Sequence, residues 1–358
     1  MNPPMTRRML IQRGSLAAGA ITAGGLLAAC GTSSSSSKVT SGEAVAGGGK
    51  AVDKVTWGLP AEPVSMDPAY TYDFETGAVV TNLVDSLMRF TAKGELEPSL
   101  AENVTVPNDD VLIYDLRSGV RFHDGTEMNA ADAVASLKRH LDPAVGSYFA
   151  GVFENVAAIK QTGPMQVTIE FAEPDFALPY MMATMAGAVL PKHFIEKAGS
   201  NLGKPRVGVI GTGAYQFGSW ASGSQVVIER FPGYWNKSVP RKVRQGVYTV
   251  IGDTQTMLAA LQSGEIDGTF RVTGRDAVTV KGFENVNVLT APGLGYDGVG
   301  FNQRQPGSPF GSAQARQALV PVGPNHLARC WRINATANLP KSTKRSSPVV
   351  LNSQRKEL

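Results

Sequence analysis

The chain has 358 residues, of which 42% are hydrophobic and 18% charged, with a formal net charge of +4. A chain of this length can bury a sizeable core, and two domains are the starting expectation for it. Residues 319–358 hold seven basic residues and one acid, and residues 1–29 hold three arginines and no acid, which leaves residues 30–318 at −5. The excess positive charge therefore belongs to the two ends, and a nucleic-acid-binding body is disfavoured.

The first 29 residues are typical of a bacterial export signal. Arginines at 7, 8 and 13 form a positive start, and the apolar run that follows has roughly 12 residues, too few to cross a membrane. The run ends in Leu-Ala-Ala-Cys, the pattern of a lipoprotein signal in which Cys30 becomes the first mature residue and carries lipid. Two acyl chains anchor a protein stably where one is marginal. We expect a signal peptide over 1–29 and a protein held at the outer face of the cytoplasmic membrane.

Residues 30–51 are rich in serine and glycine and are typical of a flexible tether. The pair Arg7-Arg8 resembles a twin-arginine signal, but lipoproteins also use the general route, so both routes stay open. Cys30 and Cys330 are the two cysteines of the chain. With Cys30 lipidated, no intramolecular disulfide is possible, and Cys330 is left unpaired.

Two elements are predicted at the start of the body. Val55–Leu59 is a short β-branched and aromatic run stopped by Pro60, which predicts a strand. After a polar and aromatic loop, apolar residues recur at helical spacing from Glu75 to Met88. They predict a helix in a segment that closes at Lys93-Gly94.

A hairpin is predicted next. Its parts are the strand Val111–Leu116, the turn 117–119, the alternating residues Val120 and Phe122, and an end at His123-Asp124-Gly125.

Three later elements are marked by caps and alternation. Asn129 predicts the N-cap of a helix that carries Asp132 at its third position. Val226–Arg230 predicts a strand, and Asp253 predicts the N-cap of a helix that stops at Gly264. Helices and strands interleave with many turns, which indicates a mixed α/β body.

Catalytic signatures are absent from the sequence. Its four histidines form no metal-binding spacing, no Gly-x-Ser-x-Gly elbow occurs, and Gly211-x-Gly213 lacks the third glycine of a dinucleotide fingerprint. His123 precedes Asp124 in a turn, where a carboxylate bonding its own backbone is the favoured interpretation over an acid–base dyad. Arg117 and Asp124 are expected to define a hairpin and to contact no ligand. We expect no enzyme, no metal and no cofactor.

Five motifs in order resemble one family, the peptide/oligopeptide-type extracellular solute-binding proteins of ABC importers (family 5). They lie at 82–102, 114–134, 211–235, 258–267 and 301–319, and the most distinctive reads YDLRSGVRFHDG from Tyr114. The resemblance implies a two-lobed, class II periplasmic-binding-protein-like α/β fold that closes around its ligand. It also implies a peptide or similar small solute as ligand, held by main-chain hydrogen bonds and hydrated pockets, ABC permease subunits as partners, and a monomer.

The same resemblance implies ligand contacts at four positions. Tyr72, Asp73 and Phe74 match the segment that contacts the ligand backbone in peptide-binding members, and Tyr296 falls where the family lines its cleft. Ordinary core packing is an equally good interpretation of Tyr296. Within the family, dipeptides, oligopeptides, nickel chelates and some sugars are all carried, and nothing in this sequence chooses among them.

The resemblance stops after Arg316–Leu319. Val320–Pro324 ends the helix that family members would continue, and the composition becomes basic and poor in acids. We expect a frameshift near 319, so that 52–319 is the N-terminal part of the domain, 320–358 is an aberrant tail, and the C-terminal lobe is largely missing. Peptide capture would then be impaired, because half a cleft cannot exclude water. A natural disordered tail is the alternative.

Two functions from other classes stay open. One is an exported, lipid-anchored hydrolase, and the other is a tethered module that uses the basic tail on anionic lipid.

Overall fold

The computed structural model describes residues 51–70, 73–91, 93–270, 272, 274–289, 307–308 and 312. Most of the described residues belong to the first of two compact units, Met1–Val272 with Ala277–Leu289, while residues 274–276, 307, 308 and 312 belong to the second. The predicted signal peptide with Cys30, nearly all of the tether and the tail at 320–358 lie outside the described residues.

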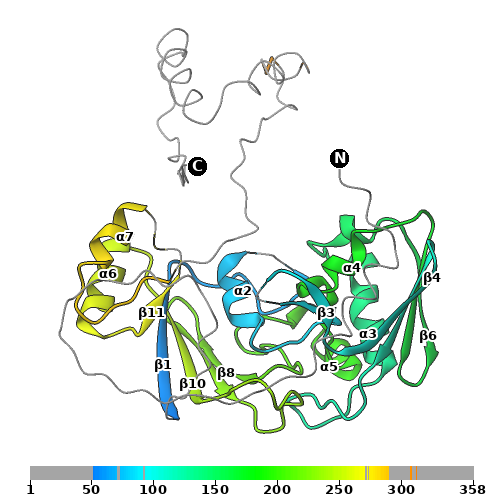
Figure 1. The fold of residues 1–358 in the computed structure, drawn as a ribbon, viewed down its shortest axis with the longest axis horizontal. Helices are drawn as coiled ribbons and strands as arrows, with labels where there is room; N and C mark the ends of the chain where they lie inside the picture. Colours follow the sequence, from blue (N-terminus) through cyan, green and yellow to red (C-terminus); the bar gives the residue numbers. More distant parts are fainter. Residues whose placement is uncertain are drawn as a thin grey trace, which may run out of the picture. The chain divides into compact units, whose positions relative to one another are not determined.

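A mixed sheet of five strands forms one part of the first unit, in the order β11-β1-β10-β9-β8 (Figure 1). The strands are β1 (Val52–Leu59), β8 (Tyr215–Ala221), β9 (Gln225–Arg230), β10 (Val243–Val250) and β11 (Gly268–Thr269). β1 runs parallel to β10 and β11, so their carboxyl ends meet at one edge, while β10, β9 and β8 pair antiparallel. The strands predicted at Val55–Leu59 and Val226–Arg230 are confirmed.

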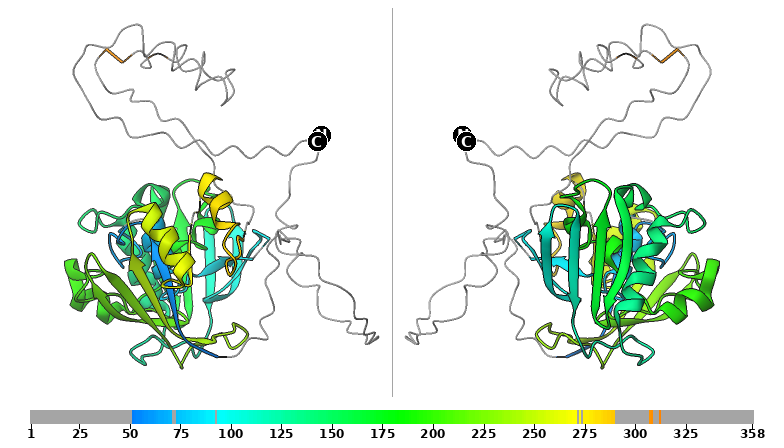
Figure 2. Two further views of the ribbon diagram at one scale, coloured as in Figure 1. Left: turned by 90° about the vertical axis from the view of Figure 1, so that its left-hand side faces the viewer. Right: turned by 90° about the vertical axis from the view of Figure 1, so that its right-hand side faces the viewer.

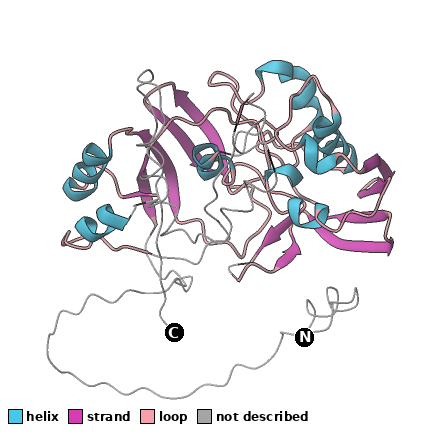
Figure 3. Cartoon of the chain, turned by 90° about the horizontal axis from the view of Figure 1, so that it is seen from above, coloured by secondary structure: helices cyan, strands magenta, loops and turns pink. Residues whose placement is uncertain are grey.

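A second sheet is antiparallel throughout, in the order β4-β5-β7-β6, and is separate from the first (Figure 3). Its strands are β4 (Ala101–Asn108), β5 (Val111–Leu116), β6 (Val156–Gly163) and β7 (Gln166–Phe171). In β5, Leu112, Tyr114 and Leu116 are buried and alternate with less buried residues, the period-2 pattern of a sheet with one covered face. Helix α3 (Ala130–Lys138) packs on β6 and β7 (Figure 2).

The other elements are short. A two-stranded ribbon joins β2 (Met88–Phe90) to β3 (Leu96–Pro98), and the remaining helices are α2 (Phe74–Val80), α4 (Leu178–Met181), α5 (Lys192–Ala198), α6 (Thr254–Ser263) and α7 (Gly274–Val280). Within the described residues, short 3-10 helices lie at Arg139–Leu141, Ala150–Phe153, Met185–Gly187 and Gly199–Asn201. Helices and strands interleave as predicted, and the mixed α/β class is confirmed.

The predicted helix caps are confirmed in detail. Asn129 Oδ1 accepts from the Ala131 N–H at 2.8 Å, and the Asp132 carboxylate accepts from the Asn129 N–H at 2.9 Å, which is a capping box. Asp253 Oδ1 accepts from the Thr256 N–H at 2.8 Å and starts α6. Gly264 ends α6 at φ +78°, a conformation that favours glycine.

The helix predicted from Glu75 to Met88 is wrong beyond Val80, where α2 ends. The apolar residues Val84, Leu87 and Met88 of the second half are buried as the spacing suggested. They lie in irregular chain and in strand β2 instead of a helix. The Asp85 N–H donates to Thr212 Oγ1 at 3.2 Å, and Ser86 bridges to Ala188. These long-range pairings hold the backbone where a helix would need its own hydrogen bonds.

The predicted hairpin of 111–125 is also wrong in its pairing. Strand β5 is confirmed, but its partners are β4 and β7. Val120 and Phe122 are buried without forming a strand, and Arg121 makes a single bridge to Glu127. The alternation reflects burial in a loop, because both side chains point into the core.

The core contains a buried tyrosine whose hydroxyl has no hydrogen-bond partner among the described residues. The Tyr114 side chain is fully buried in β5, and burial raises the pKa of its phenol. We expect Tyr114→Phe to leave the free energy of unfolding unchanged or to raise it by about 1 kcal/mol, because no hydrogen bond is lost. Urea unfolding measures this change. Tyr248→Phe is the matched control, since the Tyr248 hydroxyl accepts from Asn82 Nδ2 at 3.2 Å, and it is expected to be destabilising. An equal loss in both variants would contradict the prediction.

Candidate functional site

Two of the four predicted ligand-contact residues are described. Tyr72 and Tyr296 lie outside the described residues. Asp73 is the N-cap of α2, and its Oδ1 accepts from the Thr76 N–H at 2.7 Å. Phe74 is the first residue of the same helix. The local reason for this arrangement is the cap, because an aspartate in extended conformation satisfies a free N–H of the first turn.

Phe74 joins an aromatic cluster that also contains Trp57 and Phe270. The rings of Trp57 and Phe270 stack with centroids 4.7 Å apart and planes 16° apart, and Phe74 meets Phe270 edge-on at 5.4 Å. All three side chains are half-buried. Such offset and edge-on pairs are the favoured geometries of aromatic rings.

The sheet topology brings these rings together. Trp57 lies near the carboxyl end of β1, and Phe270 directly follows β11, which is parallel to β1. Gly268 faces Trp57, and a Cβ there would lie 2.5 Å from the indole ring, so glycine makes room for it. In open α/β sheets, ligands bind at the carboxyl ends of the parallel strands. The aromatic cluster lies at this edge of the sheet. Trp57 and Phe270 could not be identified as site residues from the sequence, because more than 200 residues separate them.

The described chain after β1 contains a buried ion pair between Asp67 and Arg139. Arg139 donates from Nη1 and Nη2 to the two oxygens of Asp67, at 2.9 and 2.5 Å. The side chains are 11% and 9% exposed. The Asp67 oxygens also receive the Ala69 N–H at 3.0 Å. This bidentate contact fixes the backbone around Asp67, in the described chain that follows β1.

Asp85 organises a second polar group, away from the predicted ligand contacts. Its carboxylate accepts from Thr212 Oγ1 at 3.0 Å, Tyr234 Oη at 3.2 Å and Trp235 Nε1 at 2.8 Å. Burial raises the pKa of Asp85, and the hydrogen bonds from Trp235, Thr212 and Tyr234 oppose that shift. Burial likewise raises the pKa of Tyr234, with the Asp85 charge adding to the effect.

The glycines around Thr212 serve close packing. The Gly213 N–H donates to Leu83 O at 3.0 Å, and a Cβ on Gly213 would lie 2.4 Å from Asn82 O. His123 accepts from the Gly211 N–H at Nδ1 (3.2 Å), so its Nε2–H donates to Gly213 O at 3.1 Å. Burial lowers the pKa of His123 to about 4. This group of contacts is structural.

The turn interpretation of Asp124 is confirmed. Asp124 Oδ1 accepts from the Thr126 N–H at 3.0 Å and from Thr126 Oγ1 at 2.7 Å, while Oδ2 meets His193 Nε2 at 2.8 Å. His123 makes its hydrogen bonds to Gly211 and Gly213 instead. The adjacent residues 123 and 124 therefore form no dyad with each other.

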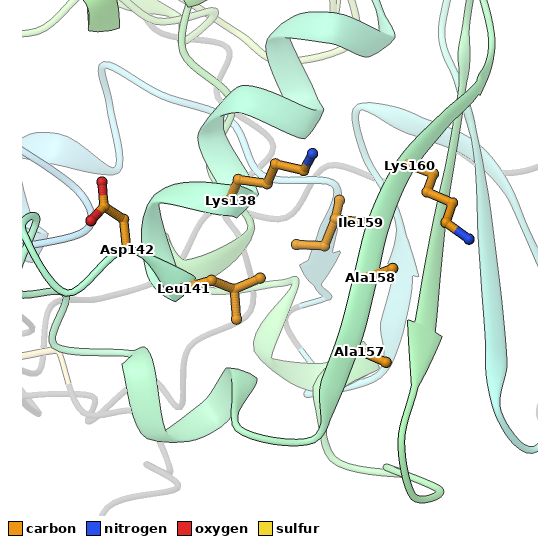
Figure 4. A pocket seen from close by; sticks show the side chains of 7 residues that line it. All are labelled: Lys138, Leu141, Asp142, Ala157, Ala158, Ile159 and Lys160. Atoms are coloured by element: carbon orange, nitrogen blue, oxygen red, sulfur yellow. The ribbon is translucent and has the colours of Figure 1, made fainter.

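A surface pocket lies apart from all of these groups, between the end of α3 and strand β6 (Figure 4). It is lined by Lys138, Leu141, Asp142 and residues 157–160, with a volume of about 450 Å³. Lys160 Nζ is already paired with Glu170 at 2.7 Å. The pocket is shallow and contains none of the predicted contact residues, so it is not part of the candidate site.

Within the part of the chain that the structure describes, no three His, Cys, Asp or Glu side chains come close enough to hold a metal ion. Over the same residues, no helix combines the length and apolar character needed to span a membrane.

Comparison with protein families identifies similarity over most of the body. Residues 95–320 match the family model described as bacterial extracellular solute-binding proteins, family 5, middle. Glutathione-binding protein GsiB from Escherichia coli O1:K1 / APEC is 30% identical over 257 residues, which are 71% of this chain and 49% of that protein. The chain thus spans about half the length of the curated relatives it matches.

Solved structures agree with this similarity. The binding protein AgaA from A. tumefaciens R10, in complex with agropinic acid, is 26% identical with a TM-score of 0.60, and the match covers 63% of this chain and 45% of AgaA. NikZ from Campylobacter jejuni, in complex with Ni(L-His), is 27% identical with a TM-score of 0.59, over 65% of this chain and 46% of NikZ.

Proposed function

The chain belongs to family 5 of the bacterial extracellular solute-binding proteins, and from this premise we propose that it is the substrate-binding component of an ABC importer that captures peptides. The observation that carries the proposal is the aromatic cluster of Trp57, Phe74 and Phe270 at the carboxyl ends of β1 and β11. It lies beside the segment that the family resemblance assigns to the ligand backbone. The similarity to a glutathione-binding protein supports a peptide ligand, since glutathione is a tripeptide.

The geometry suits binding without turnover. The rings offer apolar faces that tolerate many side chains, and a ring pair contributes about 0.5–1.5 kcal/mol beyond its buried area. The Asp73 side chain caps the first turn of α2, and the ion pair of Asp67 with Arg139 fixes the described chain after β1. Water can re-pair with different ligand side chains at small cost, which fits a broad choice of peptides.

Location and attachment are part of the same proposal. Members of this family act outside the cytoplasm, and the lipoprotein pattern ending at Cys30 supports attachment by lipid to the outer face of the cytoplasmic membrane. A monomer that passes its peptide to ABC permease subunits follows from the same family. The change of composition at residue 320 supports an aberrant tail over 320–358 and a domain part over 52–319, so we propose that this chain captures peptides weakly.

Saturation-transfer NMR tests the function, because it detects weak and rapidly exchanging ligands. With the full chain, we expect saturation of glutathione and of tri- to pentapeptides, and none of a disaccharide or of a nickel–histidine complex. Phe74→Ala removes one ring of the cluster and is expected to reduce the peptide signal several-fold. Phe176→Ala is the matched control, since Phe176 is exposed and belongs to another region.

Three results would overturn the proposal. If no peptide receives saturation, the chain does not bind peptides under these conditions. If Phe74→Ala gives the same peptide saturation as the wild type, the aromatic cluster is not where peptides bind. A signal confined to the nickel complex or to the sugar would show that the ligand belongs to another class that the family carries.

A further inference from the structure

A shallow basic pocket lies between the turn at 117–121 and the loop at 233–237. Its volume is about 510 Å³, and every charged residue in its lining is cationic. The lining consists of Arg117, Ser118, Gly119, Arg121, Gly233, Trp235, Asn236 and Lys237. This pocket is distinct from the aromatic cluster, with which it shares no residue.

Arg117 is held in a fixed orientation at this pocket. Its guanidinium lies 5.0 Å from the centroid of the Trp235 ring, and its Nε donates to Ser99 O at 3.3 Å. The Trp235 ring is itself fixed, because its Nε1 donates to buried Asp85. Stacked guanidinium groups lose little side-chain entropy when they bind an oxyanion.

The other two cations remain without a carboxylate partner in the described part of the chain. Arg121 Nη1 donates to Gly125 O at 2.9 Å, and Lys237 Nζ donates to Tyr234 O at 2.5 Å. Both side chains are exposed and both partners are neutral carbonyls, so the positive charges are not neutralised by these contacts.

Three acidic residues lie near the pocket without lining it, and one of them is Asp85, which accepts from the lining Trp235. Glu102 Oε1 is 3.6 Å from Arg117 Nη1, and Glu127 Oε1 accepts from the Gly119 N–H at 3.2 Å. The Glu102 side chain is 62% exposed, and water screens its effect on Arg117. The three cations therefore supply all of the charge in the pocket lining, in a body whose net charge over residues 30–318 is negative.

We propose that this pocket binds a phosphate-bearing anion. A phosphate monoester presents up to two negative charges and three acceptor oxygens, which match three cations in the lining of one pocket better than a single carboxylate does. The guanidinium groups of Arg117 and Arg121 provide paired donors, and Lys237 provides a point charge. The phosphate has two possible sources, a soluble phosphate ester or the headgroup of an anionic lipid. This proposal gives Arg117 a binding role, whereas the sequence analysis expected it to serve the fold and to contact no ligand.

The test compares two double variants with the same change of charge. Arg121→Gln/Lys237→Gln removes two pocket cations and leaves Arg117 and its packing in place. Arg89→Gln/Lys160→Gln is the matched control, because both of these exposed cations are already paired, with Glu97 and Glu170. Thermal unfolding checks that both variants fold.

Binding is measured with the full chain at low salt, by calorimetry with glycerol 3-phosphate and by co-sedimentation with vesicles of phosphatidylcholine containing phosphatidic acid. We expect about a tenfold loss of affinity in the pocket variant for at least one probe and less than a twofold change in the control. A loss confined to glycerol 3-phosphate assigns the soluble source, and a loss confined to vesicles assigns the headgroup. Absence of binding to both probes, or equal losses in the two variants, would overturn the proposal.

Discussion

Replacing Asp85 by alanine is expected to lower the free energy of unfolding by about 3–5 kcal/mol. The carboxylate is the common acceptor for Thr212, Tyr234 and Trp235, which come from a loop and a turn far along the chain. Alanine would leave three donors without their acceptor, and each orphaned buried donor costs about 1–3 kcal/mol. Urea unfolding followed by circular dichroism gives the change.

A double-mutant cycle with Thr212→Val separates the network from simple loss of packing. Because both residues serve the same group of hydrogen bonds, the cost of Asp85→Ala/Thr212→Val is expected to be smaller than the sum of the two single costs. Asp53→Ala provides a control, since Asp53 is exposed and pairs only with Arg244 among the contacts described for it. Strict additivity, or a loss for Asp85→Ala no larger than that for Asp53→Ala, would show that Asp85 does not hold this region together.

Local signals in the sequence predicted local structure well. The caps at Asn129 and Asp253 and the stop at Gly264 depend on hydrogen bonds within a few residues, and all three are confirmed. The same holds for the turn carboxylate of Asp124. Because both partners of each hydrogen bond lie within a few residues of each other, a short stretch of sequence is enough to predict these features.

Elements that depend on distant partners were predicted poorly. The apolar spacing between Val80 and Met88 is compatible with a helix, but Thr212 and Ala188 pair with this segment and hold it open. Strand β10 pairs with β1 across about 190 residues of sequence, and no local pattern shows that partnership. Tertiary contacts override helical spacing here because each buried polar group needs a partner.

The candidate site divides in the same way. Asp73 and Phe74 were identified through resemblance to a family motif, and the cap explains the position of Asp73. Trp57 and Phe270 were not identified, because only the parallel pairing of β1 with β11 brings their rings together. Family resemblance thus located one side of the aromatic cluster, and the fold supplied the other.

Acidification from pH 7 to pH 5 is expected to destabilise the fold through two histidines, the buried His140 and the half-buried His123. Burial lowers the pKa of both His123 and His140 to about 4. His140 Nδ1 lies 2.7 Å from Ser147 Oγ and Nε2 lies 2.9 Å from Ala186 O, while its ring stacks on Phe153 at 4.5 Å. Their surroundings therefore favour neutral rings.

The direction of the pH effect follows from proton counting. An unfolded histidine has a pKa of about 6.5, so between pH 6.5 and 4 the unfolded chain binds more protons than the folded one. The free energy of unfolding then falls as the pH falls, by at most about 1.4 kcal/mol per pH unit for each histidine. At pH 5 this amounts to about 2 kcal/mol each, or about 4 kcal/mol for the pair. Asp85 acts in the opposite sense, because its pKa is raised in the fold.

Urea unfolding at pH 5, 6, 7 and 8 measures this dependence, and substitution assigns it. His140→Gln removes one of the two titrating rings and is expected to halve the slope between pH 5 and 6.5, whatever its effect on stability at pH 8. Tyr248→Phe is the control, since it removes the hydrogen bond from Asn82 without removing a histidine, and it should leave the slope close to that of the wild type. An unfolding free energy that stays flat from pH 8 to 5, or a slope that Tyr248→Phe reduces as much as His140→Gln does, would mean that His123 and His140 do not control the acid stability of this fold.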